Sequence, residues 1–403
     1  MRVMGLAAVL WAATIAAALS QPRPAFHGTL DQHPVIDYRG GVLNDAVTVA
    51  RRDIEAGKTT LAFDGPQGFL QSLLAVLDVP VESQVLVFSK TGIQLAFTSP
   101  ETPRALYFND RVIVGYIPGA PVIEMASHDP RQGIVFQTLV QSAAGPNQFA
   151  RPDRCLGCHL SANSMEVPGI LVRSIFTAPD GRSMPALGSF LVDHRSPLEQ
   201  RWGGWYVTGT HGAVRHMGNA MITDAMNPER AIGDSTLNRS TLSDRVDRSG
   251  YLRNSSDITA LMVFDHQGHA MNLLTRLGWE ARVAAAEGRL DFSSGELGAL
   301  AREVADYLAL TGEVVLTAPV KGTSGFAEAF AAAGRRDRKG RSLRDLDLQT
   351  RLFKYRCSYM IYSPAFDALP PEAKSAVLAR MREVITDPAT VEILDDTKAS
   401  WRH

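Results

Sequence analysis

One stretch decides the fold of this 403-residue chain: RALYFNDRVIVGYI (104–117), followed by PVIEMAS (121–127) and GIVFQTLVQS (133–142). Apolar residues tend to recur at every second position, and Gly, Pro, Asp or Asn bound each segment, as in half-buried β-strands. The same pattern precedes them in SQVLVFSK (83–90) and IQLAFTS (93–99). We therefore predict a meandering, mainly antiparallel sheet over residues 83–142.

Helical spacing flanks this sheet on both sides. Before it, Asn44 or Asp45 can cap a helix from residue 46, and a second short amphipathic helix is expected from Pro66. After it, Asp257 is a plausible N-cap for the longest helical run of the chain. Further helical segments are expected at 294–310, within 350–369 and, as the last helix, from Pro371 to about Ile385.

The prediction is thus an α+β fold with four parts. They are a signal peptide (1–20), an N-terminal helix and β-meander region (21–142), a loop-rich region (143–256) and a mainly helical C-terminal region (257–403). The third part is punctuated by Gly and Pro, with strand candidates only at ILVRSIFTA (170–178) and GGWYVTG (203–209). Loop-rich stretches of this kind often carry functional sites.

Composition excludes several classes of protein. Hydrophobic residues make up 45% and charged residues 21%, near the average for globular proteins. Lys and Arg total 41 against 42 Asp and Glu, so no positive excess is present to bind a nucleic-acid backbone. Nucleic acid is therefore not expected as a partner. The three cysteines are too few for a disulfide scaffold.

Two of those cysteines form the segment Cys155-Leu156-Gly157-Cys158-His159, which is the C-x-x-C-H pattern of covalent haem c attachment. Cysteines at i and i+3 lie on one face of a helical turn, where both thiols can add to the vinyl groups of one porphyrin. His159 is then the proximal iron ligand. Gly157 is expected to leave room for the macrocycle beside the backbone.

Other chemistries can use the same residues. A disulfide or a thioredoxin-like pair would explain the two cysteines but not His159, and no βαβ pattern surrounds them. Zinc would need two further ligands, for which His211 and His216 are the only candidates with a suitable spacing.

The N-terminus supports haem attachment independently. Arg2 precedes an uncharged run from Val3 to Leu19 that ends in Ala18-Leu19-Ser20, as in a cleaved secretory signal peptide. We predict a periplasmic or secreted protein without a membrane span after cleavage. Haem c is attached outside the cytoplasm, so the two signals agree.

Through Cys155, Cys158 and His159 the chain resembles c-type cytochromes. Five longer segments of the sequence resemble a family of large bacterial secreted proteins with one C-x-x-C-H motif and no established activity. They are RALYFNDRVIVGYIPG (104–119), RCLGCH (154–159), VPGILVRS (167–174), RWGGWYVTGTHGAVRHMGN (201–219) and LFKYRCSYMIYSPAFDALP (352–370). The resemblance spans roughly residues 100 to 390 and implies one haem c, export and electron chemistry. In cytochromes c, a proline carbonyl beyond the motif often receives the proximal imidazole N–H, and Pro168 is the nearest candidate here.

The side chain at the sixth coordination position of the iron, or its absence, decides whether the haem transfers electrons or binds small molecules. Iron-competent side chains cluster in two places, a Gly-flanked loop and the long helix after Asp257. The candidates are His211, His216, Met217, His266 and His269.

Other residues have expected supporting roles. Arginine matches carboxylates in a bidentate manner, so the arginines that flank the motif can contact the haem propionates. They are Arg151, Arg154 and Arg173. Trp202 and Trp205 are expected to wall the pocket, Cys357 to be a buried free thiol in a helical stretch, and the basic cluster at 335–344 to be a solvated loop.

Two functions follow. The first is a monohaem c-type cytochrome that exchanges electrons with a periplasmic partner protein. The alternative is a peroxidase- or oxidoreductase-like haem enzyme with an open or displaceable sixth position. The length of the chain favours more than electron carriage, because a small carrier needs only about 100 residues. The single haem motif argues against an enzyme, because secreted peroxidases with c-type haem usually pair a catalytic haem with an electron-delivery haem. The sequence therefore predicts redox chemistry and leaves catalysis undecided.

Overall fold

A computed structural model describes residues 28–402, and the predicted signal peptide lies outside this range. The fold is α+β, as predicted. A six-stranded antiparallel sheet has its strands in sequence order, from β1 to β6. Its strands are β1 (Val85–Val87), β2 (Arg104–Phe108), β3 (Val112–Tyr116), β4 (Val122–Asp129), β5 (Gly133–Val140) and β6 (Phe149–Ala150).

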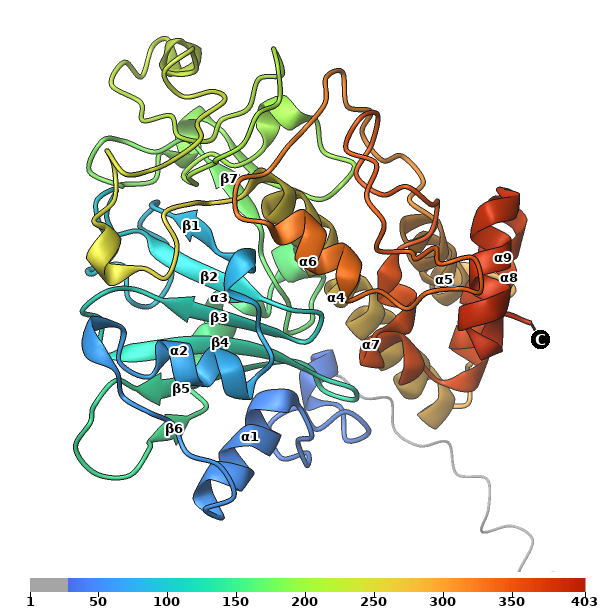
Figure 1. Ribbon diagram of the computed structural model, residues 1–403. Coiled ribbons are helices and arrows are strands. Elements are labelled where there is room, and N and C mark those ends of the chain that lie inside the picture. The colour runs from blue at the N-terminus through green and yellow to red at the C-terminus, as the bar shows by residue number, and fades with distance from the viewer. Residues whose placement is uncertain (1–27, 403) are drawn as a thin grey trace, which may run out of the picture.

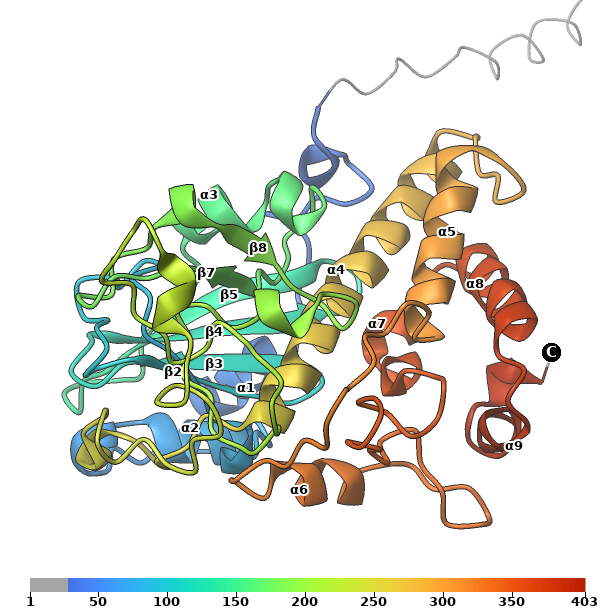
Figure 2. The same ribbon diagram turned by 90° about the horizontal axis from the view of Figure 1, so that it is seen from above.

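The two faces of this sheet pack against different elements. One face, with Tyr107, Val114 and Ile123, packs against the helices α1 (Ala46–Glu55) and α2 (Leu70–Val76). Figure 2 shows those helices on one side of the sheet, and the short helix α3 (Leu156–His159) with β7 (Arg173–Ile175) and β8 (Ser189–Leu191) on the other. The second face therefore looks toward the predicted haem-attachment motif.

Aspartate caps begin the two best-predicted helices. The Asp45 side chain accepts hydrogen bonds from the amides of Val47 and Thr48, and it also binds Gln137 on β5. Asp257 accepts from Thr259 and Ala260 at the start of α4 (Ile258–Ala286). Each cap satisfies backbone N–H groups that a helix start leaves without partners.

Helix α4 is the central element of the molecule. It is buried over most of its surface, because it packs between the sheet and the C-terminal helices (Figures 1 and 2). Those helices are α5 (Gly295–Leu308), α6 (Phe326–Ala332), α7 (Pro364–Asp367), α8 (Pro371–Val384) and α9 (Pro388–Thr397). No helix within residues 28–402 is long and apolar enough to cross a membrane.

Four predictions about individual segments are wrong. Residues 93–97 of IQLAFTS form turns, because the buried Gln94 side chain bonds to β4 instead of the backbone forming a ladder. GGWYVTG contributes only isolated bridges, one of them between Trp205 and Val87. The 350–369 segment is mostly irregular, with only a short 3₁₀ turn (Tyr359–Tyr362) and α7. The helix that starts at Pro371 is followed by another, α9.

Candidate functional site

The C-x-x-C-H residues line a deep cavity. Cys155 ends a 3₁₀ turn and α3 follows at once, so both cysteines and His159 lie on one helical turn. Cys155 is partly buried, Cys158 is exposed, and both are free thiols. The cavity measures about 640 Å³, within the usual range for small-molecule and cofactor sites.

The second sheet face forms one wall of this cavity. Because side chains alternate along a strand, the inward residues belong to every second position of β1 to β5. They are Val87, Arg104, Leu106, Ile113, Gly115, Glu124, Ala126, Phe136 and Thr138. Met125 also borders the cavity, but its side chain belongs to the opposite face, in the cluster with Val114. The wall is thus mainly apolar, with one pair of charged residues.

One nitrogen of the His159 ring is held in place. Its Nδ1 lies 2.8 Å from the carbonyl oxygen of Gly169, and the Gly169 amide donates to the His159 carbonyl at 2.9 Å. Only a protonated Nδ1 can donate to a carbonyl, so Nε2 carries the lone pair. Burial lowers the pKa of His159, which favours this neutral form. The carbonyl predicted for this role was that of Pro168, but the structure uses its neighbour, Gly169.

Asn272 on α4 fixes the segment that carries this carbonyl. Its Oδ1 accepts from the amide of Ile170 at 2.7 Å, and its Nδ2 donates to the Ile170 carbonyl at 2.8 Å. Position 169 must be glycine at this contact, because a Cβ there would lie 2.5 Å from Asn272 Oδ1. A buried helix therefore orients the His159 ring through two hydrogen bonds. Sequence reasoning did not find Asn272.

The charged pair on the sheet wall was also missed. Arg104 on β2 and Glu124 on β4 form an ion pair at 3.6 Å, with 16% and 22% of their side chains exposed. Gln94 donates to Glu124 Oε1 at 2.9 Å. Both charged residues share a face with apolar positions of their strands, and that break in the alternation was the available signal.

Only some of the residues predicted to flank the haem line the cavity. Arg154 and Arg173 line the cavity, as does Trp205, whose indole donates to the Arg173 carbonyl at 2.8 Å. Arg151 does not line it. Its guanidinium donates to the Tyr38 carbonyl and lies over the Tyr38 ring. Trp202 is buried elsewhere and donates to Asp265.

None of the five candidate sixth ligands lines the cavity. In the Gly-flanked loop, the Nε2 atoms of His211 and His216 are 3.2 Å apart, and the Gly218 amide donates to Nδ1 of His216. Met217 is buried, with its sulfur 3.5 Å from the Ser174 hydroxyl. These side chains therefore bond to the loop and its neighbours.

The two candidates on α4 belong to a buried polar cluster. His266 Nδ1 is 2.8 Å from His194 Nδ1, and His266 Nε2 is 2.6 Å from the Ser358 hydroxyl. His269 lies beside Asp193 and Arg195. The predicted spacing is present, but the imidazoles face α5 and the 350–362 segment.

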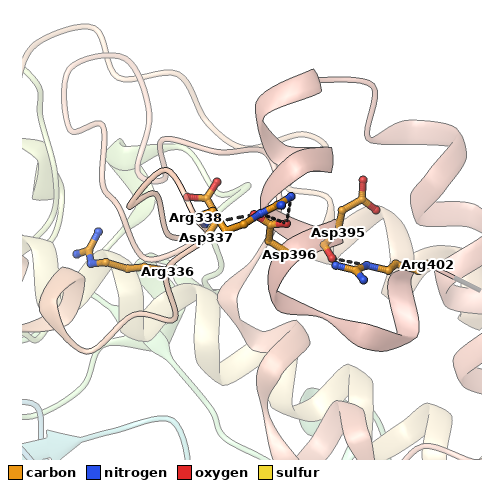
Figure 3. A pocket seen from close by; sticks show the side chains of 6 residues that line it. All are labelled: Arg336, Asp337, Arg338, Asp395, Asp396 and Arg402. Carbon is orange, nitrogen blue, oxygen red and sulfur yellow. Dashed lines mark hydrogen bonds and ion pairs between the residues drawn. The ribbon is translucent and has the colours of Figure 1, made fainter.

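The basic cluster is neutralised by acidic side chains. Arg338 pairs with Asp396 and Lys339 with Glu392, both from α9, and Arg344 pairs with Asp110. Figure 3 shows the surface hollow beside this cluster, which is lined by Arg336, Asp337, Arg338, Asp395, Asp396 and Arg402. Its lining alternates in charge and contains no apolar side chain that could hold a cofactor. Cys357 is buried and free, as predicted, but lies in an irregular segment.

No group of three or more His, Cys, Asp or Glu side chains within residues 28–402 is arranged to hold a metal ion. His211 and His216 thus do not join Cys155, Cys158 and His159. No family model matches the chain, and neither does any curated protein or solved structure.

Proposed function

We propose that this chain is an extracytoplasmic haem c protein with one covalently attached haem. The observation that carries the proposal is the cavity itself. It brings two free thiols and an imidazole with an available Nε2 to one apolar space, next to the sheet wall.

The residues present fit the group. Cys155 and Cys158 would hold the porphyrin, His159 Nε2 would bind its iron, and Arg154 and Arg173, which line the cavity, would meet its carboxylates. When bound, haem supplies an iron centre that changes oxidation state. Gly157 and Cys158 are exposed, so the attachment turn forms an outer rim of the cavity where a partner protein can approach.

Of the two predicted activities, the geometry favours catalysis at an open sixth position. Apart from His159, the residues that line the described cavity present no His, Met or Lys side chain to it, because Met125 points to the other sheet face. A pure electron carrier usually holds a second strong ligand, whereas an open position admits small molecules. Electron exchange with a periplasmic partner remains part of the proposal, because redox catalysis needs a donor or acceptor.

The test begins with protein made in a host that attaches haem c. A denaturing gel stained for haem should show one covalent haem, which Cys155→Ala or Cys158→Ala should weaken and the control Cys357→Ala should not. Complete loss of haem to acid acetone from the wild type would refute attachment.

Spectra then test the coordination. The reduced protein should bind carbon monoxide rapidly, and His159→Ala should retain the haem with altered absorption bands. A low-spin reduced haem that excludes carbon monoxide would instead support the electron carrier.

A further inference from the structure

The two charged side chains on the sheet wall meet across a strand that carries a glycine between them. Gly115 on β3 is paired with Leu106 on β2 and with Glu124 on β4. A Cβ at Gly115 would lie within 3.7 Å of the Leu106, Glu124 and Arg104 side chains. These are ordinary van der Waals distances, so Gly115 leaves open the space over β3 across which Arg104 and Glu124 pair.

Both members of the pair keep polar capacity that other described residues do not use. Glu124 Oε1 is held by Gln94, whose amide also donates to the Val122 carbonyl at 3.1 Å, so the carboxylate is oriented. Its Oε2 faces Arg104 at 3.6 Å, too far for a hydrogen bond. The Nε of Arg104 is buried and has no hydrogen-bond partner among the described residues. Arg104 and Glu124 both line the cavity that contains His159, with an oriented carboxylate in Glu124 and a guanidinium beside it in Arg104.

We propose that Arg104 and Glu124 are the proton-handling pair for a hydroperoxide substrate, with Gln94 as a positioning residue. This inference rests on the proposed function and names its substrate class. Heterolytic cleavage of an O–O bond is accelerated by a base that takes the proton from one oxygen and returns it to the leaving oxygen. It is also accelerated by a positive group that stabilises the negative charge developing on the leaving oxygen.

The reaction balances with an external donor. A hydroperoxide ROOH takes up two electrons and two protons and yields ROH and water. Two equivalents of a one-electron reductant supply the electrons, and solvent supplies the protons. Glu124 Oε2 carries a proton between the two oxygens as their bond breaks, and Arg104 donates a hydrogen bond to the oxygen that leaves.

The pair also discriminates among small ligands. Carbon monoxide carries no proton and needs neither residue. An anion such as nitrite would be attracted by Arg104 but repelled by Glu124 in the same mainly apolar cavity. A neutral, proton-bearing molecule uses both groups at once.

The experiment uses the full haem-loaded protein with hydrogen peroxide, and ferrocyanide as the electron donor. Glu124→Gln should lower the second-order rate of reaction with peroxide by about 100-fold, the range for loss of a positioned acid-base group. Arg104→Met should lower it by about 100-fold or more, the range for loss of one donor aimed at the developing charge. Carbon monoxide binding to the reduced protein should stay within threefold for both variants.

The matched control is Glu82→Gln. Glu82 also pairs with an arginine, Arg253, and is similarly exposed at 28%, but it does not line the cavity. Its variant should react with peroxide like the wild type. If Glu124→Gln does not fold, Glu124→Asp keeps the carboxylate and should retain a reduced but measurable rate.

The outcomes separate the two proposals. A wild type that binds no carbon monoxide refutes the open sixth position and supports the electron carrier, and a wild type that loses all its haem to acid acetone refutes haem attachment. A wild type that binds carbon monoxide while Glu124→Gln keeps its peroxide rate overturns the proton-handling role alone. The role of Arg104 is likewise overturned if Arg104→Met keeps the wild-type rate of reaction with peroxide.

Discussion

His159 and His266 lie in two regions that hold imidazoles in contrasting ways. At His159, one ring nitrogen is tied to the Gly169 carbonyl, and the residue borders a cavity of about 640 Å³. At His266, both nitrogens have protein partners, His194 and Ser358, and the side chain is fully buried. The two histidines therefore differ in whether a ring nitrogen has a lone pair available and in whether there is open space beside the side chain. A histidine can serve iron only where its neighbours leave a nitrogen unused.

The polar cluster around His266 links α4 to the segment of residues 193–202. Arg201 and Asp265 form an ion pair with 1% and 0% of their side chains exposed, and Trp202 donates to the same carboxylate. Burial raises the pKa of Asp265 to about 7, against the opposing effect of Arg201. The cluster holds α4 to the 193–202 segment, so we assign it to stability, whereas the proposed chemistry belongs to the cavity.

The largest expected effect tests this assignment. Arg201→Met leaves the Asp265 carboxylate buried without its cation, which should lower the free energy of unfolding by about 3 to 5 kcal/mol. Urea denaturation measures the change. The haem bands of the folded fraction should stay as in the wild type.

The control for that variant is Arg338→Met, which breaks an ion pair at the surface. It should leave the denaturation midpoint unchanged. If Arg201→Met altered the haem spectrum without a loss of stability, the division between the two regions would be wrong.

Asn272 lies on α4, like His266, and supports the segment that holds His159, so its variant should affect both stability and the haem. Asn272→Ala removes the partners of the Ile170 amide and carbonyl, at a cost of about 2 to 4 kcal/mol. The Gly169 carbonyl also loses its support, so the absorption bands and reduction potential of the haem should shift. Asn227→Ala, which alters only a surface contact with Asp224, should change neither. A destabilised variant with the wild-type potential would exclude the positioning role of Asn272.

The caps show what could be predicted from the sequence. Asp45 and Asp257 act locally, on amides two and three residues ahead, so their role is visible in the sequence itself. The β-meander could likewise be predicted from alternation, because each strand pairs with the next one along the chain.

Long-range contacts explain what could not be predicted. Arg104 and Glu124 meet only through the register that places Gly115 between them, and no local pattern encodes a register. In the same way, alternation in IQLAFTS predicted a strand, but the Gln94 amide bonds to β4. The choice of the Gly169 carbonyl over that of Pro168 depends on the distant Asn272.

Acid should destabilise the protein partly through histidines that the protein holds neutral. Burial lowers the pKa of His216 to about 3, and His211 reinforces this. The unfolded chain binds this proton below pH 6.5, so the free energy of unfolding falls as the pH drops from 6.5 toward 3. His216 contributes a slope of at most about 1.4 kcal/mol per pH unit in this window.

The variant His216→Gln isolates that slope. Between pH 6 and pH 4 its stability should fall less steeply than that of the wild type, by up to about 1.4 kcal/mol per pH unit. Denaturation at pH 7.5, where His216 is neutral in both states, measures the cost of the lost hydrogen bonds separately. Parallel pH profiles for the two proteins would show that His216 titrates normally in the fold.

The prediction with the smallest expected effect tests the contrast between His159 and the other histidines directly. Alanine at each former candidate for the sixth ligand should leave the haem absorption bands of the folded protein unchanged, because none of these side chains lines the cavity. The candidates are His211, His216, Met217, His266 and His269. His159→Ala is the positive control, since its Nε2 is the nitrogen that the Gly169 contact leaves available. If one of the five variants changed the bands as strongly as His159→Ala, that residue would reach the iron. The loop or helix that carries it would then have to leave its present hydrogen bonds, and the open sixth position would be lost with them.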